Sequence, residues 1–81
     1  MVIVVHLHTT LQRPARPGEP PVGTLTLTLP DDAVLAEVLA LLDVPLDPEN
    51  LLLVVNGRWA EPEQLLQEGD QVHLIPAISG G

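Results

Sequence analysis

Alternating apolar and polar residues predict two strands in the first third of the chain. Residues 2–8 and 24–29 both repeat with the period of two that is typical of a strand with one buried face. The residues expected on the buried face are Ile3, Val5, Leu7, Leu25, Leu27 and Leu29. The proline-rich segment 9–21 has no such period and is expected to be the loop that joins these strands into a hairpin.

A helical period replaces the alternation at residues 33–42. The apolar stripe expected at positions i, i+3, i+4 and i+7 consists of Leu35, Val38, Leu39 and Leu42. Burial of four such side chains against a sheet contributes about 6 to 12 kcal/mol, at ~1.5 to 3 kcal/mol each. Asp31 and Asp32 precede the helix and are interpreted as groups that cap its N-terminus rather than as acid/base catalysts.

The second half of the chain predicts three more strands. The expected elements are a loop at Asp43–Asn50, strands at Leu51–Val55, Arg58–Trp59 and Gln71–Ile75, and one helical turn at Pro62–Leu66. Asn56-Gly57 is a strong signal for a hairpin turn, and Glu68-Gly69-Asp70 predicts a second tight turn.

The order of these elements predicts an α+β fold of the β-grasp type. In this fold a mixed sheet of four to five strands wraps around one main helix, with the first and last strands parallel and adjacent. Residues 1–76 are expected to form the domain. Residues 77–81 are expected to form a flexible tail that ends in Gly-Gly, which has no side chains to pack.

Composition narrows the classes of function. Eleven acidic residues against three basic ones give a formal charge of −8, which disfavours binding to nucleic acid or to an anionic membrane. The absence of cysteine excludes disulfides and thiolate metal sites. The apolar runs are shorter than the ~20 residues that a membrane span needs. A cytoplasmic protein is therefore expected.

Three segments resemble one family. LPDDAVLAEVLALL, VVNGRW and LLQEGDQVHLIPAISGG are similar to the corresponding parts of the MoaD/ThiS group of ubiquitin-like sulfur carriers. The ending IPAISGG is most similar to the small subunit of molybdopterin synthase. Val34 departs from the capping threonine of these relatives, Ala77 departs from a frequent second proline, and the loop 9–21 is unusual.

The resemblance implies a carrier that is a co-substrate and not an enzyme. Its C-terminal Gly81 would be adenylated and converted to a thiocarboxylate, while Gly80 allows the tail to pass through a narrow slot. The chain itself is expected to bind no cofactor, since ATP and magnesium belong to a separate E1-like adenylating enzyme. The other implied partners are a sulfur-donating persulfide enzyme and the large subunit of molybdopterin synthase or another sulfur acceptor.

The sheet face that points away from the helix is the expected docking surface for these partners. Its predicted residues are Val4, His6, Leu52, Val54, Trp59, His73 and Ile75, and the tail residues Pro76, Ile78 and Ser79 are expected to contact partners as well. Trp59 is interpreted either as the aromatic anchor of this surface or as a cover for a strand end.

His6, His8 and His73 are expected on this same face, but no metal site is predicted because no acidic or cysteine ligand accompanies them. Several functions remain open at this stage. The sulfur could serve molybdenum cofactor synthesis, thiamine synthesis or tRNA thiolation. The chain could also be a ubiquitin-like protein modifier, or a β-grasp interaction domain that needs no free C-terminus.

Overall fold

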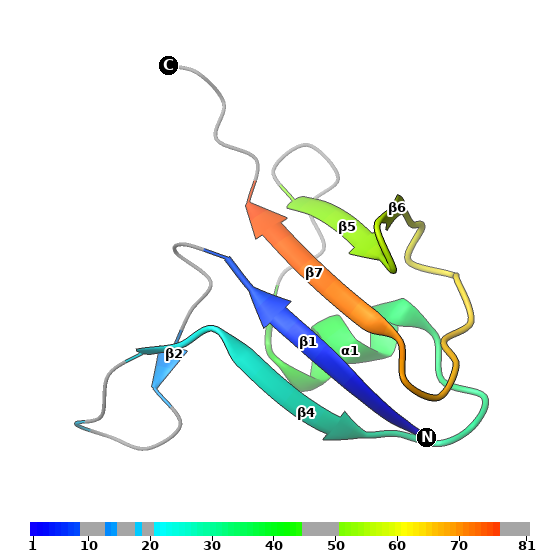
Figure 1. Cartoon of the computed structure of the whole chain (residues 1–81), viewed down its shortest axis with the longest axis horizontal. Helices are drawn as coiled ribbons and strands as arrows, with labels where there is room; N and C mark the ends of the chain where they lie inside the picture. Colours follow the sequence, from blue (N-terminus) through cyan, green and yellow to red (C-terminus); the bar gives the residue numbers. More distant parts are fainter. Residues whose placement is uncertain (9–12, 15–17, 19–20, 45–50, 77–81) are drawn as a thin grey trace.

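The computed structural model describes residues 1–8, 13–14, 18, 21–44 and 51–76. The strands of its main sheet are β1 (Val2–Leu7), β4 (Thr24–Thr28), β5 (Leu51–Val55), β6 (Arg58–Trp59) and β7 (Gln71–Pro76), and the helix is α1 (Leu35–Leu41). These five strands lie in the order β4-β1-β7-β5-β6, and α1 lies behind the sheet in Figure 1. Within the described ranges, no helix is both long and apolar enough to span a membrane.

Parallel pairing of β1 with β7 forms the middle of the sheet. Val5 is opposite Val72 in this ladder, and the remaining ladders of the sheet, β1 with β4, β7 with β5 and β5 with β6, are antiparallel. The first strand therefore pairs with the last, as the sequence predicts for a β-grasp fold. The predicted hairpin of the first two long strands is confirmed by the pairing of β1 with β4.

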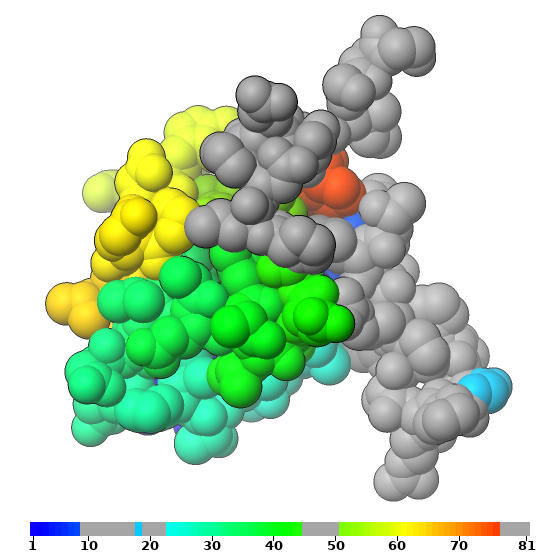
Figure 2. Space-filling view, turned by 180° about the vertical axis from the view of Figure 1, so that it is seen from behind, coloured from blue at the N-terminus to red at the C-terminus, as the bar shows by residue number. Residues whose placement is uncertain are grey.

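The core lies between the sheet and α1, and it is made of aliphatic side chains. The largest fully buried residues are Ile3, Val5, Leu35, Val38, Val72 and Leu74. Figure 2 shows the opposite side of the molecule, where α1 and the segment after β6 cover the sheet. The predicted stripe of α1 is confirmed, although its last member, Leu42, is only half-buried.

The predicted loop 9–21 contains two short strands. β2 (Arg13–Pro14) and β3 (Pro21–Val22) pair antiparallel and form a separate two-stranded sheet. A strand of two residues is too short to show an alternating pattern, so sequence periodicity could not reveal it. Proline is compatible with such an edge position because it needs no ladder hydrogen bond there.

The predicted capping of α1 by Asp31 and Asp32 is wrong. The N-cap residue is Val34, which makes no side-chain capping bond. The first helical N–H groups instead donate to backbone oxygens of the segment after β6, from Leu35 to Gln64 (2.9 Å) and from Ala36 to Pro62 (2.8 Å). This backbone contact satisfies donors that a capping side chain would otherwise serve. The same segment forms a turn and not the predicted helical turn.

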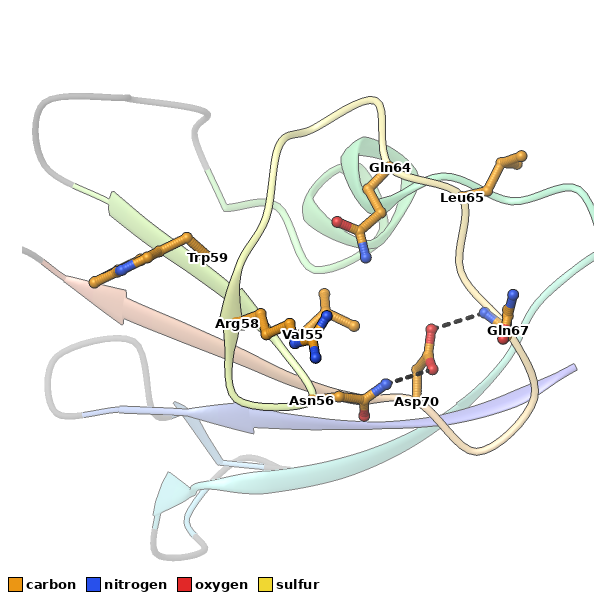
Figure 3. Close-up of a pocket in the computed structure, with 8 residues that line it drawn as sticks. All are labelled: Val55, Asn56, Arg58, Trp59, Gln64, Leu65, Gln67 and Asp70. Atoms are coloured by element: carbon orange, nitrogen blue, oxygen red, sulfur yellow. Dashed lines mark hydrogen bonds between the residues drawn. The ribbon is translucent and has the colours of Figure 1, made fainter.

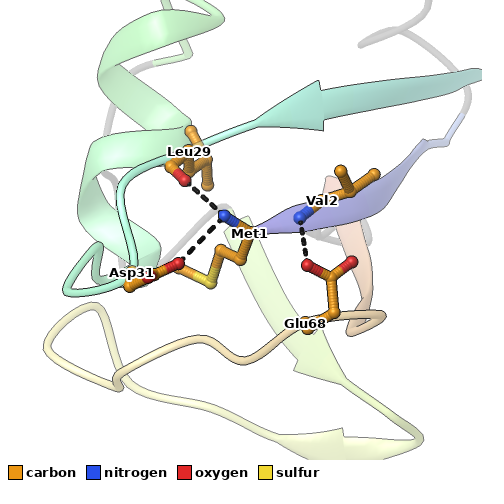
Figure 4. A network of polar contacts seen from close by, with 5 residues as sticks. All are labelled: Met1, Val2, Leu29, Asp31 and Glu68. Carbon is orange, nitrogen blue, oxygen red and sulfur yellow. Dashed lines mark hydrogen bonds and ion pairs between the residues drawn. The ribbon is translucent and has the colours of Figure 1, made fainter.

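Asp31 contacts the N-terminal ammonium group instead. The Met1 ammonium donates to the Leu29 carbonyl (2.7 Å) and to Asp31 Oδ1 (3.2 Å), and Val2 N–H donates to Glu68 Oε1 (3.0 Å) (Figure 4). Asp31 is almost fully exposed, so its ion pair contributes little to stability. The network nevertheless holds the start of β1 against the turns on either side of it.

Candidate functional site

The open face of the sheet is the candidate site. Strand pairing places one row of residues across all five strands, in the order Thr24, His6, His73, Val54 and Trp59. Residues paired in this way point to the same side of a sheet. His6, His73 and Val54 are half-buried, and Trp59 is 73% exposed. The row therefore joins polar, imidazole and aromatic groups on one surface.

The neighbouring rows add apolar side chains to this face. Val4, Leu52 and Ile75 are half-buried, and Ile75 pairs with Leu52. The predicted set on the sheet is therefore brought together on one face. Pro76 is the last residue of β7, whereas Ile78, Ser79, Gly80 and Gly81 lie outside the described residues.

The open face carries no acidic side chain on the strands of this sheet, although the chain is strongly acidic. The sequences of these strands are VIVVHL, TLTLT, LLLVV, RW and QVHLIP. The described carboxylates lie in the helix and in the segments that connect the strands. A largely apolar face without acidic side chains, on a strongly acidic chain, is suited to contact with another protein.

Three imidazoles meet in the middle of this face. His8 Nε2 and His73 Nδ1 are 2.9 Å apart, which is a hydrogen bond between the two rings. The His6 ring stacks on the His73 ring with centroids 4.3 Å apart. His6 Nε2 also donates to Gln71 Oε1 (2.8 Å). Burial lowers the pKa of His73, and the neighbouring His6 and His8 lower it further.

A metal site is not evident in this part of the chain. Among the described residues, no group of three or more histidine, cysteine, aspartate or glutamate side chains is arranged to hold a metal ion. The facing nitrogens of His8 and His73 are instead joined by their hydrogen bond. The expectation that the chain binds no metal stays a prediction.

The two turn motifs of the sequence meet at one end of the sheet. Asn56 and Gly57 have φ values of 53° and 82°, the left-handed conformation of a two-residue hairpin turn. Asp70 is buried and accepts hydrogen bonds from Asn56 Nδ2 (2.9 Å) and from the backbone N–H of Gln67 (2.8 Å). Asn56 Oδ1 accepts from Gln71 N–H (2.9 Å). These bonds position β5 beside β7.

A polar hollow of about 500 Å³ lies beside these turns. Asn56, Arg58, Gln64 and Asp70 contribute to its lining (Figure 3). None of the described lining residues is a serine, cysteine or histidine, and Asp70 is already hydrogen-bonded. The hollow therefore offers no nucleophile and base pair of the kind that covalent catalysis requires.

Asp70→Ala is expected to destabilise the fold by about 1 to 3 kcal/mol, because it leaves two donors of the turns without their acceptor. Glu63→Ala is the matched control, since Glu63 is an exposed carboxylate of the neighbouring segment. Its effect is expected within ~0.5 kcal/mol. Urea unfolding measures both variants, and equal midpoints for the two would contradict a structural role for Asp70.

Comparisons with known proteins support the fold and identify the family. A search of curated proteins gave no match. The crystal structure of SAMP1 from Haloferax volcanii is similar with a TM-score of 0.76 and 21% identity, over all of both chains. A ubiquitin-like protein from Caldiarchaeum subterraneum is similar with a TM-score of 0.56 and 21% identity, over 99% of this chain and 100% of the other. The model of the ThiS family matches residues 16–81, most of the sequence, and the chain therefore belongs to the ThiS family.

Proposed function

We propose that this chain is a sulfur carrier whose Gly81 carboxylate is converted to a thiocarboxylate. The family match carries this proposal, because it extends through the tail to residue 81. The strand that leads to the tail, β7, is held on both sides by β1 and β5. Such a scaffold gives the tail a fixed starting point close to the open face.

The chemistry requires activation by another protein. A carboxylate anion is a poor electrophile, so an oxygen of Gly81 must first attack the α-phosphate of ATP, with release of pyrophosphate. The terminal sulfur of a persulfide can then attack the acyl carbon and displace AMP. A thiol reductant cleaves the resulting sulfur–sulfur bond and leaves the thiocarboxylate. The E1-like adenylating enzyme, which holds ATP and magnesium, and the persulfide enzyme are therefore the proposed partners.

The molybdenum cofactor is the proposed destination of the sulfur. The similarity of IPAISGG to the end of the molybdopterin synthase small subunit supports this choice. The carrier would then bind the large subunit of that synthase and supply sulfur to its substrate. Thiamine synthesis and tRNA thiolation use the same carrier chemistry, and conjugation to lysine amines of other proteins uses the same adenylate.

Intact mass spectrometry tests the proposal. The full chain is incubated with ATP, magnesium, the E1-like adenylating enzyme and a persulfide donor. Replacement of one C-terminal oxygen by sulfur is the expected result. An unchanged mass, with an adenylating enzyme that is competent on another carrier, would contradict the proposal. A product linked to lysine of another protein would favour the modifier function.

Trp59→Ala is expected to weaken binding of the adenylating enzyme about 30-fold, or ~2 kcal/mol, because an exposed tryptophan on an apolar face is a typical anchor. Leu65→Ala is the matched control. Leu65 is similarly exposed at 63%, but it forms a bridge with Val34 at the start of the helix and is not part of the open face. Titration calorimetry measures both affinities. If both variants lost the same affinity for the adenylating enzyme, Trp59 would not be an anchor of the docking surface.

A further inference from the structure

His6, His8 and His73, here called the histidine cluster, occupy the centre of the open face. His6 and His73 are directly opposite in the parallel ladder, and His8 follows the last residue of β1. The hydrogen bond between the rings of His8 and His73 joins residues that are 65 positions apart in the sequence. The cluster therefore exists only when β1 and β7 are paired.

The hydrogen bond leaves one further nitrogen on each ring, here called the outer nitrogen. One ring must donate an N–H to the other, so a neutral pair contains one internal N–H and one hydrogen on an outer nitrogen. The outer atoms are His73 Nε2 and His8 Nδ1, and neither has a hydrogen-bond partner among the residues that the structure describes. The neutral pair can therefore present either a donor or an acceptor at His73 Nε2.

Uptake of one proton by the pair makes His73 Nε2 a hydrogen-bond donor. A singly protonated pair keeps its internal hydrogen bond, which becomes charge-assisted, and both outer nitrogens carry hydrogen. Uptake of a second proton would place hydrogens on both facing nitrogens and break the bond between them. The stacked His6 also opposes a second charge, because its ring centroid is 4.3 Å from that of His73. The cluster is therefore suited to carry one positive charge, with a donor on each outer nitrogen.

Among the residues that the structure describes, the strands beside the cluster offer no group that would compensate this charge. The groups that face the cluster are Thr24 from β4, Gln71 from β7, Val54 from β5 and Trp59 from β6, and none of them is ionisable in this pH range. The His73 pKa is accordingly lowered by burial and by the two neighbouring imidazoles. A negative group brought against the face would supply the countercharge that the described strands do not offer the cluster.

We propose that the histidine cluster is the recognition site for a carboxylate side chain of the partner that docks on the open face, and that docking promotes uptake of a proton. This proposal rests on the proposed function, because it takes the adenylating enzyme as the partner. The remainder of the carrier is acidic and repels carboxylates, so the cluster is the part of the open face where such a side chain is favoured.

The direction of the pH dependence follows from this contact. A carboxylate beside the cluster opposes the lowering of the His73 pKa and raises this pKa in the complex above its value in the free carrier. Binding is then stronger at low pH and weakens as pH rises through the pKa of the complex. A rise of about one pKa unit corresponds to a maximum of ~10-fold in affinity.

The experiment is titration calorimetry of the full chain with the adenylating enzyme, without ATP and with a metal chelator, between pH 8 and pH 6. Buffers of different ionisation enthalpy give the number of protons taken up. We expect net uptake of up to about half a proton, which is the maximum for a rise of about one pKa unit, and several-fold tighter binding at pH 6. In His73→Gln the uptake and the pH dependence should both disappear. His8→Gln is the second variant, and Leu65→Ala, which is exposed but not part of the open face, is the control that should behave as wild type.

The outcomes separate this proposal from the function on which it rests. Binding of the wild-type chain that does not change with pH would overturn the proposal, as would proton uptake equal to that of the wild type by folded His73→Gln and His8→Gln. Uptake that appears only when zinc replaces the chelator would also overturn it, in favour of a metal site. Thiocarboxylate formation is measured by mass in parallel at pH 8. If the thiocarboxylate forms but docking takes up no proton, the carrier function stands and the proposal for the histidine cluster fails. If docking takes up a proton but no thiocarboxylate forms, only the carrier function is rejected.

Discussion

Deletion of Gly81 is expected to abolish thiocarboxylate formation while leaving the fold intact. The deletion still leaves a terminal carboxylate, that of Gly80, but an extended chain becomes shorter by about 3.3 Å. Misplacement of a reacting group by ~1 Å can already reduce a rate about 100-fold. The acyl carbon would therefore fall short of the nucleotide on the adenylating enzyme. Intact mass after incubation with ATP, magnesium, enzyme and persulfide donor measures the effect.

Two controls define what this variant tests. The thermal transition of the shortened chain should equal that of the wild type, since residue 81 lies beyond the last strand, which ends at Pro76. Gly80→Ala keeps the length and adds only a Cβ, so it should slow thiocarboxylate formation by blocking a narrow slot. Wild-type yield from the chain without Gly81 would refute the assignment of the reacting carboxylate.

Leu39→Asp is expected to unfold the domain. Leu39 is 2% exposed in the interface between α1 and the sheet. Truncation of a buried leucine alone costs about 2 to 5 kcal/mol, and a buried charge without a partner adds to this loss. The sum is comparable with the 5 to 15 kcal/mol that typically stabilises a whole domain. Loss of the cooperative transition in circular dichroism is the expected observation.

Leu41→Asp provides the matched control for this change. It introduces the same residue into the same helix, but Leu41 is 64% exposed. Its effect on the free energy of unfolding should stay at about 1 kcal/mol, which reflects the lower helix propensity of aspartate and its position at the C-terminus of the helix. If both variants melted at the same temperature, the packing of α1 could not be the main source of stability.

Elements with a strong period could be predicted from the sequence. The alternation of residues 2–8 and 24–29, the stripe of α1 and the Asn56-Gly57 turn each follow from local chemistry, and each is present, with both strands one residue shorter than predicted. The parallel pairing of β1 with β7 follows from their order in a β-grasp fold. The same alternation also placed the residues of the open face on one side of the sheet.

Contacts between distant segments could not be predicted in the same way. The N–H groups at the start of α1 are satisfied by backbone oxygens at Pro62 and Gln64, and no residue type encodes a backbone acceptor. The partner of Asp31 is the ammonium group 30 positions away, which periodicity cannot find. The ring-to-ring bond of His8 and His73 depends on rotamers as well as on strand register. These features belong to tertiary structure.

The central position of β7 has a consequence for how the protein is made. This strand follows all the others in the sequence, yet it lies between β1 and β5, and hydrogen bonds such as Val2 N–H to Glu68 join residues 66 positions apart. A growing chain that lacks β7 has two strand edges without their central neighbour and no closed core. Folding should therefore be completed only after β7 has left the ribosome, and such distant pairings favour slow folding.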